Sequence, residues 1–183
     1  MPILRKAELS DLDEVMRLEH AGFSKPTWEA RKTFEARLAT FNDGFWVMAD
    51  PSGRLHGYLC AEVWRFAPEW NPKQFTLNHS ASETHVPDGD EVYVSSMTVD
   101  AASRGQGFGR LMFNGALAAM FKSYPALAST ILMVNEDWIH ARIIYDSVGF
   151  VTIGSMDQYF RSDSGKPQRA IIMRRLGRTP GDT

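Results

Sequence analysis

A run of alternating glycines marks the point where a predicted strand gives way to a predicted helix. The run reads Ser-Arg-Gly-Gln-Gly-Phe-Gly-Arg over residues 103–110, and an apolar stretch follows it. Because glycine has no Cβ atom, several backbone N–H groups in such a loop can turn toward one point. The N-terminus of the following helix adds unpaired donors and the positive end of its dipole. The loop therefore predicts a seat for a phosphate or diphosphate group.

The spacing of this loop separates it from two common phosphate motifs. From Arg104 it reads Arg-x-x-Gly-x-Gly, which is not the G-x-G-x-x-G of dinucleotide folds, and no Lys-Ser or Lys-Thr pair closes it. Between a strand at 91–99 and a helix at 107–121, the segment resembles the acyl-CoA diphosphate loop of the GCN5-related N-acetyltransferases (GNAT). The strand 130–134, with Asn135, Ala141 and Tyr145 after it, is similar to the second cofactor segment of that superfamily.

Periodicity and turn residues predict a mixed order of helices and strands. Ser10 is expected to open a helix with Asp13 in the capping-box position, and a second helical stretch is expected from 26 to 41. The predicted strands are 3–6, the hairpin 45–50 and 54–66, then 91–99, 130–134, 151–156 and 170–173. The expected fold class is α+β (mixed α/β). The resemblance implies a mostly antiparallel sheet of six to seven strands, splayed between its central strands, with about four helices.

Length and turn residues also predict the organisation of the chain. A chain of 183 residues fits one domain, 1–183, with its own core. Residues 67–90 are rich in Pro, Asn, Asp and Gly and are expected to form a long loop or insert near the acceptor site. Its aromatic edge either walls an acceptor pocket or packs the loop onto the sheet; the side chains concerned are Trp64, Phe66, Trp70 and Phe75. Residues 176–183 are expected to be a disordered tail.

Charge and cysteine content limit the classes of partner and compartment. The formal net charge is −2, which gives no general attraction to nucleic acid or to an anionic membrane. Cys60 is the only cysteine, so no internal disulfide can form, and this suits a reducing compartment. The N-terminus lacks the apolar run of a signal peptide, and no apolar segment is long enough to span a bilayer. A cytoplasmic location is therefore expected. The sequence leaves open whether the protein forms a homodimer.

The resemblance implies acetyl-CoA as the cosubstrate and assigns residues to it. Backbone groups of Met97, Thr98 and Val99 would bind the pantetheine arm. Loop amides and guanidinium groups would bind the diphosphate, and they come from Arg104, Gly105, Gln106, Gly107, Phe108, Gly109 and Arg110. Asn135, Ala141 and Tyr145 complete the cofactor-binding set.

Acetyl transfer to an amine sets the catalytic requirements. A primary amine with a pKa of about 10 must lose a proton before it attacks a thioester, and the departing thiolate benefits from an acid. The resemblance implies that Tyr145 is this acid, because matching tyrosines approach the thioester sulfur. A backbone N–H near Met97 or Val99 is expected to stabilise the oxyanion.

The general base is less defined by the sequence. Glu91 and Ser95 share one face of the predicted strand by alternation, and both are candidate catalytic residues, Glu91 acting through water. His79, His85 and His140 are alternatives. No close Cys or His partner stands at metal-ligand spacing, so no metal site is predicted.

The finer resemblance is to the arylalkylamine N-acetyltransferases. The segment Leu18–Phe23 is similar to the one that ends in their amine-contacting phenylalanine, which implies that Phe23 binds substrate. Trp64 and Tyr93 are also expected to bind substrate. The paired histidines of those enzymes would fall at Tyr93 and Ser95, so the proton relay differs here. The expected function is transfer to a small hydrophobic or aromatic amine. A protein N-terminal or lysine acetyltransferase, and a non-catalytic acyl-CoA sensor, are the alternatives.

Overall fold

The computed structural model describes residues 2–177, and these form a seven-stranded sheet in the order β1-β2-β3-β4-β5-β7-β6. Every neighbouring pair is antiparallel except β4 and β5, which are parallel. The strands are β1 Ile3–Lys6, β2 Phe45–Ala49, β3 Leu55–Trp64, β4 Glu91–Val99, β5 Ser129–Asn135, β6 Val151–Arg161 and β7 Pro167–Leu176. The prediction of a mostly antiparallel sheet of six to seven strands is confirmed.

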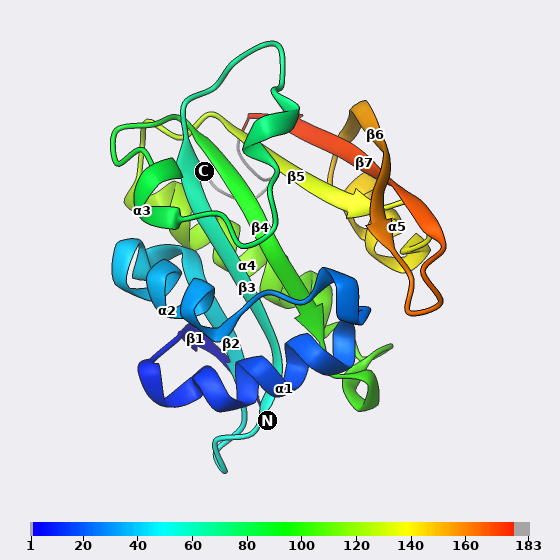
Figure 1. Ribbon diagram of the computed structural model, residues 1–183. Helices are drawn as coiled ribbons and strands as arrows, with labels where there is room; N and C mark the ends of the chain where they lie inside the picture. The colour runs from blue at the N-terminus through cyan, green and yellow to red at the C-terminus, as the bar shows by residue number, and fades with distance from the viewer. Residues whose placement is uncertain (1, 178–183) are drawn as a thin grey trace.

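Helices cover both faces of this sheet. In Figure 1, α1, α2 and α3 lie in front of it and α4 lies behind it. The helices are α1 Leu12–Gly22, α2 Arg31–Thr40, α3 Ala81–Thr84, α4 Phe108–Ser123 and α5 Ile139–Ser147. Short 3-10 turns are η1 Leu9–Asp11, η2 Lys25–Thr27, η3 Asn42–Gly44, η4 Pro72–Gln74 and η5 Ala101–Ser103. No helix among residues 2–177 is both long and apolar enough to cross a membrane.

The spacing of apolar residues explains how the two long helices pack. In α1, Leu12, Val15 and Leu18 recur at helical intervals and are at most 1% exposed against the front face. In α4 the buried stripe is Met112, Phe113, Ala116, Leu117, Met120 and Phe121, which packs against the rear face. Each fully buried large side chain contributes roughly 1.5–3 kcal/mol to folding. The helix predicted at 107–121 therefore buries one stripe, and Leu111 on its other side is exposed.

Two helix starts differ from the sequence prediction. The capping box is formed by Glu8 and Asp11, not by Ser10 and Asp13, because the Arg5 guanidinium holds the Asp11 carboxylate at 2.7 and 2.8 Å. The second helical stretch, expected from residue 26, begins only at Arg31. Residues 28–30 are extended because tertiary hydrogen bonds hold them, among them Trp28 Nε1 to Phe23 O at 2.9 Å.

The C-terminal strands are longer than predicted. β6 and β7 pair far beyond 151–156 and 170–173, since β7 has strand neighbours on both sides. Leu176, which the sequence assigns to a tail, ends β7 and pairs with Ser129. Residues 178–183 of that predicted tail lie outside the described part of the chain.

The sheet opens between its two central strands. The ladder between β4 and β5 runs from Glu91↔Ser129 to Val94↔Leu132 and stops there. Beyond that point β4 continues to pair with β3, and β5 continues to pair with β7. The prediction of a splay between the central strands is confirmed, and the opening positions the candidate site.

Candidate active site

A partly open pocket lies at the opening of the sheet. Residues 94–97 of β4 form one wall and residues 132–134 of β5 form the other. The C-terminal part of α1, the segment after it, and α5 close the pocket from both faces of the sheet. Because β4 and β5 no longer pair here, this wedge is where a ligand can meet unpaired strand backbone.

Strand β4 carries a bulge at the pocket. Cys60 pairs with Ser96 and Ala61 pairs with Val94, so Ser95 has no partner on β3. Its hydroxyl donates to Cys60 O at 3.3 Å. The bulge breaks the simple alternation of the strand, and both Ser95 and Ser96 therefore line the pocket.

Two glutamates line the front end of the pocket. Glu19, in the last turn of α1, is 1% exposed. Its Oε1 accepts the backbone N–H of Glu29 at 2.8 Å, and its Oε2 accepts the hydroxyl of Tyr58. The Tyr58 hydroxyl also lies 3.0 Å from Ser96 Oγ. A hydrogen-bonded chain thus connects Glu19 to a serine of the opposite wall.

Burial controls the charge of Glu19. Desolvation raises the pKa of this carboxyl to about 7, even though the bonds from Tyr58 and from the Glu29 backbone favour the ionised form. Desolvation also holds the pKa of Tyr58 well above 10, so its hydroxyl stays protonated and can donate to Glu19. Glu19 therefore exchanges a proton near neutral pH, as a general base requires.

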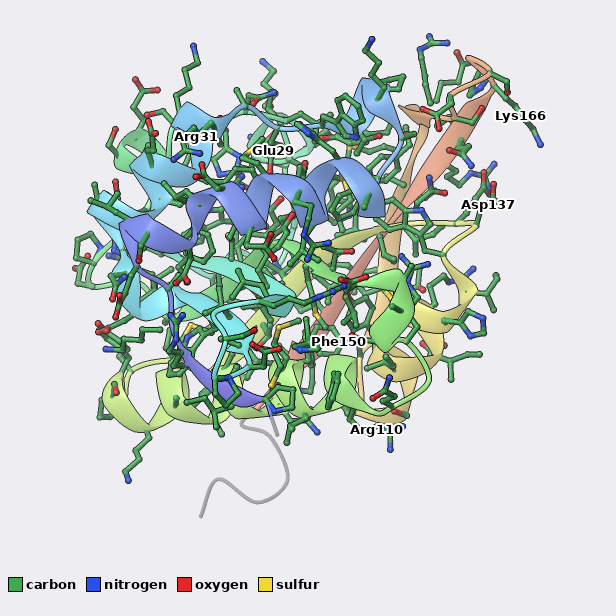
Figure 2. The ribbon with its side chains drawn as sticks, turned by 90° about the horizontal axis from the view of Figure 1, so that it is seen from below. Glu29, Arg31, Arg110, Asp137, Phe150 and Lys166 are labelled. Atoms are coloured by element: carbon green, nitrogen blue, oxygen red, sulfur yellow. The ribbon has the colours of Figure 1, made fainter. Side chains whose placement is uncertain are left out.

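Glu29 differs from Glu19 because a guanidinium neutralises it. Arg37 of α2 binds both carboxylate oxygens, at 2.6 and 2.8 Å, and the pair is buried. The backbone N–H of Asn78 in the insert donates to Glu29 Oε1 at 2.9 Å. This ion pair ties α2 and the insert to the end of the pocket. Figure 2 shows Glu29 on the opposite face of the sheet from Arg110.

Three aromatic rings from separate elements form the outer wall. Phe23 follows α1, Trp138 precedes α5 and Phe160 lies on β6, and all three line the pocket. The Trp138 ring centroid is 5.2 Å from that of Phe23 and 5.2 Å from that of Phe160. Phe23, which the sequence predicts to bind substrate, therefore lines the pocket together with two rings that the sequence did not reveal.

Tyr145 lies on α5 and lines the rear of the same pocket. Its ring packs against Phe113 and Phe150, at 5.2 and 5.9 Å between centroids. Burial raises the pKa of the Tyr145 phenol to about 12, so the hydroxyl is protonated throughout the neutral range. No hydrogen-bond partner for this hydroxyl is found among residues 2–177, which leaves its proton available to a ligand. Ala141, one turn earlier, lines the pocket too.

The predicted cofactor strand has free backbone on one side. Met97, Thr98 and Val99 pair with Leu59, Tyr58 and Gly57 of β3, while their other edge faces the splay. Alternate residues of a strand direct N–H and C=O groups to opposite edges, so part of this stretch can bond a ligand in the wedge. Met97 lines the pocket directly.

Two glycines of the loop adopt a backbone conformation that other residues disfavour. Gly105 and Gly107 have φ of 76° and 81°, in the left-handed region that disfavours a side chain, and Gly107 caps the N-terminus of α4. No acceptor among residues 2–177 binds the N–H groups of residues 105–109. These donors and the α4 dipole together form a site suited to an anion.

Two arginines flank the loop and both are exposed. Arg104 donates through Nε to Val99 O at 3.3 Å, and Arg110 donates through Nη2 to Ser147 Oγ at 3.1 Å. Figure 2 shows Arg110 at the start of α4, on the outside of the molecule. Gln106 and Phe108 complete the loop, and the Gln106 side chain donates to Ala102 O at 3.2 Å.

Some predicted site residues lie elsewhere. Glu91 is at the paired start of β4 and 2% exposed, and its carboxylate is held by Arg174 at 2.8 and 3.1 Å and by Ser129 at 2.9 Å. It does not line the pocket. Asn135 is buried at the end of β5, where its side chain accepts from Asp137 N at 3.0 Å and donates to Gln168.

The aromatic edge of the insert packs onto the sheet. Trp64 stacks on Tyr93 at 3.8 Å between centroids, and Phe75 covers both at 5.4 Å. All three are buried outside the pocket, and Leu77 is the insert residue that lines it. Of the two interpretations of this edge, the structure supports packing on the sheet. It does not bring Trp64 or Tyr93 to the candidate acceptor site.

The loop histidines have structural partners. His79 pairs with the buried carboxylate of Glu62, and His85 Nδ1 accepts the backbone N–H of Val63 at 3.1 Å. His140 is exposed on α5. None of the three lines the pocket, and no cluster of metal-ligating side chains is found among residues 2–177.

Comparison with known proteins identifies the fold. Residues 79–161 match the model of the acetyltransferase (GNAT) domain family. A search of curated protein sequences finds no significant match.

Three solved structures illustrate the similarity. The ribosomal-protein-S18-alanine N-acetyltransferase of Escherichia coli is 18% identical, with a TM-score of 0.71 over 99% of this chain and 97% of that one. The GphF GNAT-like decarboxylase in complex with isobutyryl-CoA is 20% identical, with a TM-score of 0.74 over 95% and 98%. Chaetomium thermophilum Naa20 in complex with a bisubstrate analogue is 18% identical, with a TM-score of 0.70 over 96% and 86%.

The finer resemblance to arylalkylamine N-acetyltransferases receives no support from these comparisons. The family match and the shared open sheet lead to the same conclusion. Residues 79–161 match the GNAT acetyltransferase domain family, and the chain as a whole has the GNAT fold.

Proposed function

We propose that this protein is an acetyl-CoA-dependent N-acetyltransferase that acts by direct attack of an amine on the thioester. The observation that carries the proposal is the pocket itself. It combines a carboxyl that titrates near pH 7 with a protonated phenol, at the point where the sheet opens. The GNAT family assignment of residues 79–161 supports acyl transfer as the reaction class.

Coenzyme A fits the donors that the protein presents. The free N–H groups of the glycine loop, with Arg104 and Arg110, match a diphosphate, and the open edge of Met97–Val99 matches the amides of a pantetheine arm. The acyl thioester would supply the activated acetyl group. The proposal leaves Asn135 out of direct ligand contact, because its side chain already bonds Asp137 and Gln168.

Glu19 is the proposed proton acceptor. An amine with a pKa of about 10 arrives protonated, and an ionised Glu19 both attracts this cation and accepts its proton. Ser96 and Tyr58 connect Glu19 to the β4 wall, so the proton can also pass through the hydroxyl chain. Ser95 lies beside Ser96 and helps to shape the same wall. Glu91 is not proposed as the base, because Arg174 and Ser129 occupy its carboxylate outside the pocket.

Tyr145 is the proposed general acid. Its phenol is protonated at neutral pH and lacks a partner among the described residues, so it can donate to the departing thiolate. A backbone N–H near the bulge at Ser95, or at Met97, is suited to the oxyanion. Cys60 is not a candidate nucleophile, because burial strongly raises its pKa.

The walls of the pocket suggest the acceptor. Phe23, Trp138 and Phe160 favour an apolar or aromatic group next to the amine, and we propose a small hydrophobic amine on this ground. The Glu19 carboxylate at the front end favours a second candidate, a peptide N-terminus or a lysine, because each carries a cationic amine. A non-catalytic acyl-CoA sensor is the third.

An assay of thiol release from acetyl-CoA separates these candidates. A panel of aromatic amines, aliphatic amines and short peptides with free N-termini is tested on equal amounts of protein. The proposal predicts saturable turnover with an apolar amine. Turnover with peptides alone would select the second candidate, whereas coenzyme A binding without turnover on any acceptor would select the sensor. We also propose that the protein is cytoplasmic and that it binds neither nucleic acid nor membranes.

A further inference from the structure

His56, on β3, contacts residues at both ends of the candidate diphosphate loop. Its Nδ1 lies 2.8 Å from the hydroxyl of Ser103, the last residue of η5 and the first residue of the loop. Its ring meets the ring of Phe108, the first residue of α4, edge to face at 5.7 Å between centroids. The exposed residues Arg104–Gly107 span the distance between these two contacts.

The orientation of the His56 ring is defined by a carboxylate on its other side. Nε2 lies 3.4 Å from Asp50 Oδ2. Asp50 accepts bonds from the Ser52 hydroxyl and from backbone N–H groups, which lower its pKa to about 2, so it is ionised and can only accept. Nε2 must therefore carry the proton, and in the neutral ring Nδ1 accepts from the Ser103 hydroxyl.

The backbone leading into the loop is anchored on the same residue. The carbonyl of His56 accepts the N–H of Asp100 at 2.9 Å, and the carbonyl of Asp100 accepts the N–H of Ser103 at 2.8 Å. Asp100 also accepts Ala102 N and the guanidinium groups of Arg17 and Arg54 through its side chain. Asp50, His56 and Ser103 together have the residue types of a hydrolytic triad, but Ser103 is only 4% exposed and is not accessible as a nucleophile.

We propose that His56 is a positioning residue for the diphosphate of the acyl carrier: through Ser103 and Phe108 it holds the glycine loop in the conformation that directs its N–H groups outward. Glycines allow the loop many alternative conformations. Because His56 holds both ends of the loop, less conformational entropy is lost when a ligand binds. This role rests on the proposed function, because it presupposes that the loop binds coenzyme A.

The test compares ligands with and without the diphosphate. His56→Phe keeps a ring against Phe108 but loses both hydrogen bonds, and Ser103→Ala removes the hydroxyl. Coenzyme A is titrated by calorimetry, and pantetheine, which lacks the diphosphate, is titrated through the fluorescence of Trp138 and the other tryptophans. We expect His56→Phe to raise the dissociation constant of coenzyme A about tenfold, with that of pantetheine unchanged. Because the effect acts through Ser103, the double variant should bind no more weakly than His56→Phe alone.

His85→Phe is the matched control, because His85 also bonds β3 through Nδ1, at its far end. It should lower the melting temperature and leave both dissociation constants unchanged. Equal weakening of both ligands in His56→Phe would show general structural damage and overturn the inference, as would unchanged coenzyme A affinity in that variant. The inference would also be overturned if the wild-type protein bound pantetheine but not coenzyme A. If wild type binds neither ligand, the proposed function fails together with the inference.

Discussion

Glu19 and Tyr145 occupy one pocket, and burial raises the pKa of both. The consequences differ, because the ordinary pKa values of a carboxyl and a phenol lie on opposite sides of neutrality. With a pKa of about 7, Glu19 is about half ionised at neutral pH and can therefore accept a proton. A rise to about 12 keeps Tyr145 an acid. Perturbed pKa values are frequent at catalytic sites, so these two shifts support the base and acid roles that we propose for Glu19 and Tyr145.

Tyr145→Phe tests the acid role. The variant removes only a hydroxyl that bonds nothing among the described residues, so stability and coenzyme A affinity should change little. Turnover at saturating substrates should fall by about 10²-fold, the usual contribution of a positioned acid. Steady-state kinetics with calorimetry separates the two effects. An unchanged rate at saturation would exclude Tyr145 from proton transfer.

Glu19→Gln tests the base role through its pH profile. In wild type, the fraction of ionised Glu19 rises as pH increases through about 7, so the rate should increase over this interval and then level off. In the variant, the rate should be about 10²-fold lower at pH 7.5 and should keep rising toward the pKa of the amine. A variant with the wild-type profile would show that another group accepts the proton.

At the scale of elements, the glycine loop and α4 form one unit. The loop has its donors free because Gly105 and Gly107 adopt positive φ and α4 begins directly after them. Space beside both glycines is open in the structure, so a side chain there would meet no protein atom. The cost of substitution therefore falls on backbone conformation and on the bound anion.

Gly107→Val is expected to weaken coenzyme A binding. A β-branched residue strongly disfavours the φ of 81° found here, and its methyl groups would stand where the diphosphate approaches. A rise of at least about tenfold in the dissociation constant is expected from calorimetry. Gly53→Val is the control, since Gly53 has a φ of 86° in a hairpin turn with equally open surroundings. Equal affinities of Gly107→Val and wild type would reject the anion seat.

At the scale of the whole molecule, much of the architecture follows from local signals. The strand order, the hairpin of 45–50 and 54–66, and the loop at 103–110 were predictable, because alternation, turn residues and glycines act over a few positions. The positions of Glu19 and Glu29 at the pocket were not, because α1, η2 and β4 converge only in the folded chain. The one signal was the Leu18–Phe23 segment, in which the resemblance directed attention to Phe23 and away from Glu19.

The insert and Glu91 show the same limit. The aromatic edge of the insert has one composition whether it walls a pocket or packs on the sheet, and only tertiary contacts with Tyr93 decide between them. Glu91 was predicted as a base from strand alternation, and its partner Arg174 lies 83 residues later in the chain. A long-range ion pair of this kind leaves no local pattern.

Glu91→Gln distinguishes a structural carboxylate from a catalytic one. The change weakens a buried pair that joins β4 to β7, so the free energy of unfolding should fall by about 2–3 kcal/mol. Turnover of the folded variant should match wild type. Thermal denaturation and kinetics at 20 °C, with Glu19→Gln measured in parallel, check both expectations. Loss of turnover with normal stability would make Glu91 the base instead.

The central claim is that the open sheet and the glycine loop hold a coenzyme A thioester. Calorimetric titration of coenzyme A into the purified protein tests this most directly. We expect saturable binding of one molecule per chain, with a dissociation constant in the micromolar range, which corresponds to a binding free energy of about −8 kcal/mol. Absence of any binding heat, and of any shift in melting temperature, with millimolar coenzyme A or acetyl-CoA would contradict it.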